Sequence, residues 1–200
     1  MKVLVIGATG LVGGAAADAL EAFGDEVLRA SKSSTLAVDI TDAGSIQALL
    51  DQVGTVDAIV AAVGSVPFKP LADLTAEDYL SAYRGKVASQ VDVVRLGTPH
   101  VADGGSITLT TGILAREPIL AGAAAALANG AVESFVISAA AELPRGLRIN
   151  TVSPTVLAEA TVYHSSFPGF TQVSAAEVGQ AYVKCVHGIQ TGTIIALDGR

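Results

Sequence analysis

Seven short runs rich in aliphatic residues constrain the fold of this 200-residue chain more than any other feature. The first run, KVLVIGA over residues 2–8, lacks the polar alternation of a strand with one face in water. Strands of this kind are buried on both faces, as in parallel sheets that are covered by helices. Further strands are expected over residues 26–30, 35–41, 56–64, 105–112, 147–154 and 192–199.

Segments of helical length separate these runs. Helices are expected over residues 11–23, 42–54, 75–97, 121–143 and 174–188. Asp42 stands near one N-terminus, Ser174 caps another, and Thr75 with Asp78 forms a capping box. Because strand and helix alternate throughout, the sequence predicts a single α/β domain over residues 1–200. Its architecture is a Rossmann fold, a doubly wound parallel sheet of about seven strands with helices on both faces.

The composition excludes several classes of function. A net charge of −7 argues against nucleic acid and membrane surfaces as partners, since both are bound by basic patches. No run reaches the roughly 18 apolar residues of a membrane helix. Cys185 is the one cysteine, it falls in an amphipathic segment, and a buried thiol in a reducing cytoplasm is expected. The sequence shows no metal-ligand cluster and no Gly-Lys-Ser/Thr loop for a nucleoside triphosphate.

The first strand leads into GATGLVG, where Gly7, Gly10 and Gly13 precede a helix. The first glycine permits a tight turn, the second lets backbone N–H groups approach a pyrophosphate, and the third lets helix and strand pack closely. The pyrophosphate then lies at a helix N-terminus, which favours anions, and Thr9 can donate its hydroxyl. A plain strand–turn–helix could use the same glycines. Their place in the first βαβ unit favours a dinucleotide.

The segment after the second strand indicates which dinucleotide. A preference for NAD requires Asp or Glu about 20 residues past the glycines, where the carboxylate binds the ribose 2′-hydroxyl. Here the chain reads LRASKSSTL, and Arg29, Ser31, Lys32 and Ser33 supply cations and hydroxyls but no carboxylate. We therefore expect NADP(H), although a solvated polar loop would have the same composition.

From these residues onward the chain resembles the short-chain dehydrogenase/reductase family over essentially its whole length. GATGLVG is similar to the family's glycine loop, VDIT (38–41) to its aspartate motif, and AAVG (61–64) to its Asn-Ala-Gly segment. INTVSPT (149–155) and GTIIALDG (192–199) are similar to its sixth and last strands. The cofactor residues that the motifs and the resemblance together imply are Gly7, Thr9, Gly10, Leu11, Val12, Gly13, Arg29, Ser31, Lys32, Ser33, Asp39, Ile40, Ala61, Ala62, Val63, Gly64, Pro154 and Val156.

The family's catalytic tetrad of Asn, Ser, Tyr and Lys is matched poorly. The resemblance puts Ala125 in the place of Tyr and Asn129 in the place of Lys, so the chain is an atypical member without the Tyr-x-x-x-Lys pair. Thr111, or Thr110, falls in the place of Ser, and Arg84 lies near the place of Asn. In this family Tyr transfers the proton and Lys lowers the pKa of that Tyr, which is general acid–base catalysis with a tuned group.

Other residues are candidates for the missing roles. Arg84, or Lys86 two residues later, could bring positive charge to a substrate oxygen, although a solvated helix face explains both equally well. Tyr163 and His164 could donate protons or could belong to a surface loop, and Asn129 could bind a ribose.

Two functions follow from these expectations. The first is an NADP(H)-dependent oxidoreductase that acts on a small carbonyl, alcohol or activated alkene. The second is a catalytically silent NADP(H)-binding regulator or a scaffold for a non-redox reaction. The resemblance further implies a homodimer or homotetramer.

Overall fold

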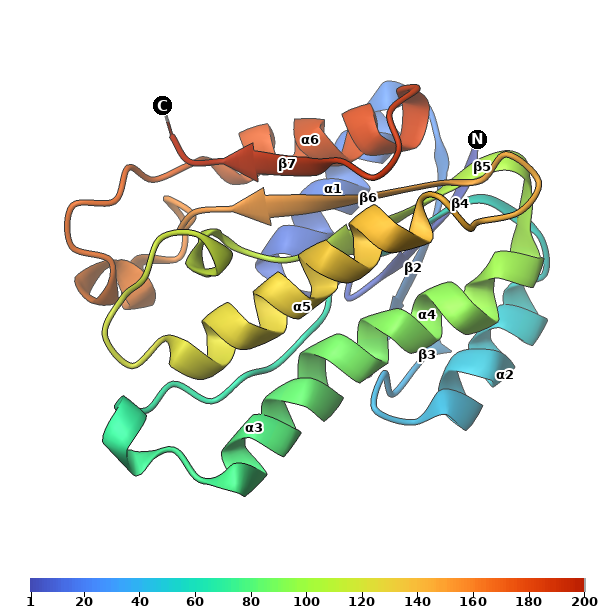
Figure 1. Cartoon of the computed structure of the whole chain (residues 1–200). Helices are drawn as coiled ribbons and strands as arrows, with labels where there is room; N and C mark the ends of the chain where they lie inside the picture. The colour runs from blue at the N-terminus through green and yellow to red at the C-terminus, as the bar shows by residue number, and fades with distance from the viewer. Residues whose placement is uncertain (200) are drawn as a thin grey trace.

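The strands form one parallel sheet in the order β3-β2-β1-β4-β5-β6-β7 in a computed structural model that describes residues 1–199 (Figure 1). Every pair of neighbouring strands runs parallel. The strands are β1 Lys2–Ile6, β2 Glu26–Ser31, β3 Leu36–Ala37, β4 Val56–Ala61, β5 Val101–Thr110, β6 Arg148–Pro154 and β7 Ile194–Leu197. The sheet confirms the expected doubly wound α/β architecture.

Helices cover both faces of this sheet. The α-helices are α1 Leu11–Phe23, α2 Ala43–Val53, α3 Ala76–Ala82, α4 Ser89–Gly97, α5 Ala123–Ala139 and α6 Ala175–His187. Helices α1 and α6 pack together over one face, and α2, α4 and α5 lie over the other (Figure 1). Short segments join them, among them the π-helix η2 Tyr83–Ala88 and the 3-10 helices η4 Ile113–Ala115 and η5 Thr161–Ser166.

Two layers of core explain why β1 is aliphatic after Lys2. In β1, Leu4 and Ile6 pack into the layer beneath α2, α4 and α5, while Val3 and Val5 pack into the layer beneath α1 and α6. All four side chains are fully buried. Because successive residues of a strand point to opposite faces, a sheet with two covered faces needs apolar residues at every position.

The expected helix caps are present. Thr75 and Ser174 each accept a hydrogen bond from the backbone three residues later, and the acidic residue there bonds back, which completes two capping boxes. Asp42 caps α2 by accepting from the backbone N–H of Gly44. These contacts are local, so sequence spacing is sufficient to predict them.

Two predicted elements differ from the structure. The helix expected over 75–97 is three consecutive pieces, α3, η2 and α4, because the backbone widens to π-type hydrogen bonding from Tyr83 to Ala88. The strand expected over 35–41 is reduced to the two residues of β3, at the edge of the sheet. Within residues 1–199, no helix combines the length and the apolar character needed to cross a membrane.

The strand order defines where a ligand can bind. The chain builds outward from β1 to β3 on one side of the sheet and then returns to place β4 on the other side of β1. At such a switch point the loops after the two neighbouring strands separate, which leaves a crevice at the carboxyl ends of the strands. The glycine loop leaves β1 at this crevice.

Candidate functional site

A pocket of about 660 Å³ lies at this crevice. One side comes from the segments after β2 and β3, the middle from the glycine loop, and the other side from the segment after β4 and from η2. Of the residues predicted to bind the cofactor, the pocket is lined by Gly7, Thr9, Gly10, Ser31, Lys32, Ile40, Ala62, Val63 and Gly64. It also contacts Arg84 and Gly85.

A side chain would meet different surroundings at each of the three glycines of the loop. Gly7 has φ of +92°, and a Cβ there would overlap the carbonyl oxygen of Ala62. A Cβ on Gly13 would overlap the carbonyl oxygen of Gly7, so this glycine allows α1 to pack against the turn. Gly10 has no such neighbour, since a Cβ there would meet nothing closer than 3.4 Å. The packing of the fold therefore leaves room for a side chain at Gly10, which lines the pocket.

The N-terminus of α1 opens into the pocket without a cap. Gly10 is the N-cap residue and supplies no side-chain hydrogen bond, so the first backbone N–H groups of the helix lack the partner that a Ser or Asp would provide. Free N–H groups and the positive end of the helix dipole together bind phosphate. The residues present therefore fit the pyrophosphate of a dinucleotide.

The polar residues after β2 separate into two groups. Ser31 and Lys32 line the pocket. Arg29 is turned away from it and binds two carboxylates of α1, with Nη2 2.6 Å from Asp18 and 2.9 Å from Glu21. The predicted recognition of a 2′-phosphate therefore depends on Ser31 and Lys32, and Arg29 instead fixes α1 against β2.

The Asp39 carboxylate pairs with Lys32, so it would compete with a 2′-phosphate for this ammonium. The Lys32 ammonium lies 3.0 Å from the Asp39 carboxylate, which also accepts hydrogen bonds from the backbone and hydroxyl of Thr41. The Thr41 hydrogen bonds, together with Lys32, lower the pKa of Asp39 to about 2. Asp39 itself does not line the pocket, whereas its neighbour Ile40 does.

A cluster of polar side chains stands beside the carboxyl ends of β5 and β6. The Glu133 carboxylate, on α5, accepts hydrogen bonds from Thr111 at 2.9 Å, from Ser153 at 2.9 Å and twice from Arg116 at 2.7 and 2.8 Å. Arg116 also donates to Ser153 at 2.8 Å. We call these four residues the Glu133 cluster. It joins two strand ends, one helix and the loop after η4.

Some of the residues predicted for catalysis are buried, and others lie at the surface. Thr111 is buried and its hydroxyl is engaged by Glu133, while Thr110 donates to the carbonyl of Ala61 at 2.8 Å. Ala125 and Asn129 are both buried on α5, and the Asn129 Oδ1 atom has no hydrogen-bond partner among the described residues.

The remaining candidates lie at the surface. Arg84 bonds to Glu77 at 3.3 Å, and both side chains are exposed. Tyr163 is 59% exposed in η5. Both ring nitrogens of His164 are engaged, Nε2 with the Leu157 carbonyl oxygen at 3.0 Å and Nδ1 with Gln172 at 3.2 Å. None of the three is brought next to the Glu133 cluster by a described contact.

Sequence reasoning missed the Glu133 cluster, apart from Thr111. Its members lie up to 42 residues apart along the chain, and the contacts form only after β5, β6 and α5 have packed. The available signal was a lone acidic residue, Glu133, in an otherwise neutral helix of alanines and aliphatic residues.

An apolar cluster adjoins this region. Ile113 and Leu114 of η4 pack with Ala125 of α5, and Phe167 and Phe170, from the segment after β6, pack against them. The two phenyl rings meet edge to face, with centroids 5.4 Å apart. A substrate that approaches the ends of β5 and β6 meets aliphatic and aromatic surface.

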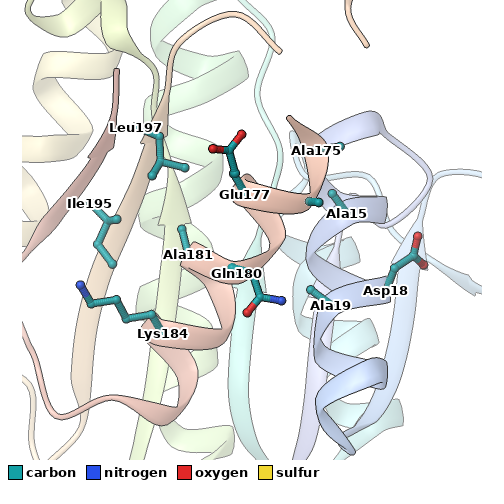
Figure 2. Close-up of a pocket in the computed structure, with 11 residues that line it drawn as sticks. Ala15, Asp18, Ala19, Ala175, Glu177, Gln180, Ala181, Lys184, Ile195 and Leu197 are labelled. Atoms are coloured by element: carbon teal, nitrogen blue, oxygen red, sulfur yellow. The ribbon is translucent and has the colours of Figure 1, made fainter. Parts of the chain in front are cut away.

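A second hollow, of about 830 Å³, lies between α1, α6 and β7 (Figure 2). Figure 2 shows that alanines form its floor and that Asp18, Glu177, Gln180 and Lys184 project around it. Glu177 is engaged in the cap of α6 and Asp18 pairs with Arg29. In residues 1–199 no group of His, Cys, Asp and Glu is placed to hold a metal ion. Most of the residues predicted to bind a cofactor that line a pocket line the first one and not this hollow.

Comparison with known proteins agrees with this arrangement. A family model described as enoyl-(acyl carrier protein) reductase matches residues 7–191. A Listeria innocua protein of known crystal structure is 48% identical, with a TM-score of 0.95 and 98% of each chain covered. A small-chain dehydrogenase crystallised in complex with NADPH is 26% identical, with a TM-score of 0.89 and coverage of 100% of this chain and 97% of that chain.

The curated relatives are longer proteins. A hydroxynaphthalene reductase of Aspergillus fumigatus is 28% identical over 142 residues, which is 68% of this chain and 50% of the relative. A similar protein of Metarhizium brunneum is 26% identical over 155 residues and 57% of its length is covered. This chain thus spans about half the length of the curated relatives that it matches. The family match, the sheet and the glycine loop together show that the chain belongs to the enoyl-(acyl carrier protein) reductase family of short-chain dehydrogenase/reductases, which are oxidoreductases.

Proposed function

We propose that this chain is an NADPH-dependent reductase of a small, largely apolar molecule with a carbonyl group or an activated alkene. The observation that carries the proposal is the uncapped N-terminus of α1, which opens into a pocket that also contains Ser31 and Lys32. The NADPH complex of a 26%-identical small-chain dehydrogenase supports the choice of cofactor. The apolar cluster and the relatives named hydroxynaphthalene reductases support an aromatic substrate.

Each part of the pocket has a separate task in this proposal. The backbone N–H groups at the start of α1 bind the pyrophosphate, and Ser31 and Lys32 bind the ribose 2′-phosphate. The residues after β4, Ala62, Val63 and Gly64, would then hold the nicotinamide end. When bound, the reduced nicotinamide supplies a hydride. The apolar cluster beside η4 excludes water from the reacting end, which strengthens electrostatic interactions there.

Calorimetric titration with NADPH and NADH tests the cofactor directly. The informative variant is Gly10→Asp, because the backbone of Gly10 is extended and a Cβ there meets nothing closer than 3.4 Å. An aspartate at the N-cap stabilises the helix and places a negative charge where the pyrophosphate is expected. We expect Gly10→Asp to fold normally and to lose NADPH binding.

Gly10→Ala is the matched control, since it adds the Cβ without the charge and should bind NADPH within a few-fold of the original chain. If the original chain prefers NADH, or if Gly10→Asp binds NADPH as tightly as Gly10→Ala does, the proposed site is wrong.

One observation favours a second function, in which the protein binds NADPH but does not oxidise it. None of the four tyrosines of the chain, Tyr79, Tyr83, Tyr163 and Tyr182, is followed by a lysine four residues later. A protein that binds NADPH without turning it over would show this pattern. NADPH deuterated at the transferred position separates the functions, since only a reductase moves deuterium into a product from a panel of quinones, ketones and enones.

A further inference from the structure

Lys86 packs against Gly64, one of the residues that line the first pocket. It lies in η2, the π-helical segment between α3 and α4, and such segments are frequent at functional sites. Arg84, two residues earlier, lines the pocket, is exposed and pairs with Glu77, whereas the Lys86 side chain is largely buried. The same helical segment therefore presents one exposed, paired cation and one largely buried cation.

The stem of Lys86 occupies the space that a side chain on Gly64 would need. A Cβ on Gly64 would lie 2.8 Å from Cγ and 3.2 Å from Cδ of Lys86. Gly64 follows β4 and lines the pocket. The Lys86 side chain therefore crosses the carboxyl end of β4, on the side of the pocket where the nicotinamide end of the cofactor is expected.

The backbone around Lys86 is fixed by two sets of hydrogen bonds. Gln90 is fully buried, and its amide nitrogen donates to the carbonyls of Lys86 at 3.4 Å and Thr110 at 2.9 Å. Its amide oxygen accepts from the backbone N–H of Thr110 at 2.8 Å. The backbone N–H of Ser65 donates to the carbonyl of Gly85 at 3.1 Å. These bonds attach η2 to the ends of both β4 and β5.

The ammonium of Lys86 has no dedicated partner. Within residues 1–199 it makes no hydrogen bond and no ion pair. Glu133 acts on it through space, but that carboxylate already accepts four hydrogen bonds from Thr111, Ser153 and Arg116. A structural lysine in a largely buried position would have its charge matched. This one is held in place with its donors free.

The other charged side chains around η2 are paired with one another. On α3, Glu77 pairs with Arg84 and Asp78 pairs with Lys69. On α4, Asp92 pairs with Arg95. On α5, Glu133 faces Lys86 and is itself paired with Arg116. Burial lowers the pKa of the Lys86 ammonium to about 8, and Glu133 acts in the opposite direction. Lys86 is thus largely protonated at neutral pH and releases its proton readily.

We propose that Lys86 is the general acid of this chain and donates a proton from Nζ to the substrate oxygen during reduction. The proposal rests on the proposed function. A hydride from NADPH adds to the carbonyl carbon, the electron pair of the C=O bond moves to oxygen, and oxygen takes the proton from the Lys86 ammonium. NADPH is oxidised to NADP⁺, the carbonyl is reduced to an alcohol, and the neutral amine regains its proton from water. Gln90 is a positioning residue in this scheme.

The test compares Lys86→Met and Lys86→Arg with Lys184→Met, a control that removes an exposed lysine from α6. The first readout is calorimetric NADPH affinity, and we expect it to stay within about three-fold in all variants. The second is steady-state reduction of a ketone and quinone panel that includes hydroxylated naphthalenes. Lys86→Met should lose about 10²–10⁴-fold in kcat/KM, the usual contribution of proton transfer. Lys86→Arg keeps the charge but does not release a proton, so it should not restore the rate.

Two further readouts separate a proton donor from a merely structural residue. The pH profile of kcat/KM should fall above about pH 8 in the original chain, and this limb should disappear in Lys86→Met. Competitive acetylation of lysines, read by peptide mass spectrometry, should give Lys86 a midpoint well below that of Lys184, with or without substrate. Loss of NADPH binding in the original chain refutes the proposed function. Unchanged turnover in Lys86→Met, or an ordinary acetylation midpoint for Lys86, refutes this inference alone.

Discussion

Replacing Lys86 with methionine should make the protein more stable. At neutral pH the folded chain holds this ammonium in a largely buried position without a hydrogen-bond partner, while the unfolded chain exposes it to water. Methionine keeps an unbranched stem over Gly64 and has a similar helix propensity. Glu133 is not orphaned by the change, because it retains its bonds to Thr111, Ser153 and Arg116. The variant therefore removes a desolvation penalty and creates no new one.

The size of the effect follows from the pKa of Lys86, which is lowered from 10.5 to about 8. Each pKa unit corresponds to about 1.4 kcal/mol, so the charged form is disfavoured in the folded state by about 3 kcal/mol. Because the side chain is not wholly buried, we expect a gain of about 2 kcal/mol. For a chain of this length that gain corresponds to about 4–8 °C in Tm.

The dependence on pH has a definite sign. Below pH 8 both folded and unfolded chains hold the proton, so the penalty is complete. Between about pH 8 and 10.5 the folded chain releases the proton while the unfolded chain keeps it, so the stability contributed by this group rises with pH. The advantage of Lys86→Met should therefore be largest at neutral pH and should disappear above about pH 10.5.

Urea unfolding at pH 7 and at pH 10.5 measures both quantities. The midpoint should increase at pH 7 with an unchanged m-value, and Lys184→Met should stay within about 0.5 kcal/mol of the original chain. A loss of stability at pH 7 would show that Lys86 is a structural residue. A gain of equal size at both pH values would show that methionine packs better and that charge is not the cause.

Three other changes test separate parts of the structure. Asp39→Asn retains an acceptor for Thr41 but releases Lys32, so NADPH affinity measured calorimetrically at low salt should rise about two- to five-fold while NADH affinity stays constant. Glu133→Gln removes the charge that pairs with the more exposed Arg116 and weakens the hydrogen bonds that Glu133 accepts, so it should reduce the free energy of unfolding by about 1–2 kcal/mol. Because Glu133 raises the pKa of Lys86, the same change should also move the basic limb of the activity profile to lower pH. Thr75→Ala removes a capping-box acceptor and should reduce the free energy of unfolding by about 1 kcal/mol, read by urea titration, with NADPH binding unaffected.

The fold was predictable from sequence because its signals are local. Aliphatic runs define the strands, and Thr75, Asp42 and Ser174 bond to backbone groups two or three residues away, which spacing alone reveals. The glycine loop was predictable for the same reason. The interruption of helix 75–97 by η2 was not, since a π-type segment has no residue preference comparable to that of a cap.

The reacting end of the site was predictable only in part. Arg29 reads as a phosphate ligand until the fold places it beside Asp18 and Glu21, two residues of another element. Thr111 reads as a free hydroxyl until Glu133 is found 2.9 Å away. In both cases the partner lies on another element, and a charged or polar side chain can be assigned a role only when its partners are known.

Three uncommon local features meet at Lys86, and their coincidence is the strongest argument for its function. A π-helical segment replaces regular α-helical hydrogen bonds, Gly64 holds φ at +138°, and a partly buried ammonium has no hydrogen-bond partner within residues 1–199. Departures from local consistency of this kind concentrate at functional sites, where the folding energy of the surrounding sheet sustains them. The place of these features in the fold is then more informative than the free energy that each one costs. All three lie near the ends of β4 and β5, beside the proposed cofactor pocket, where the proposed reaction needs a proton donor.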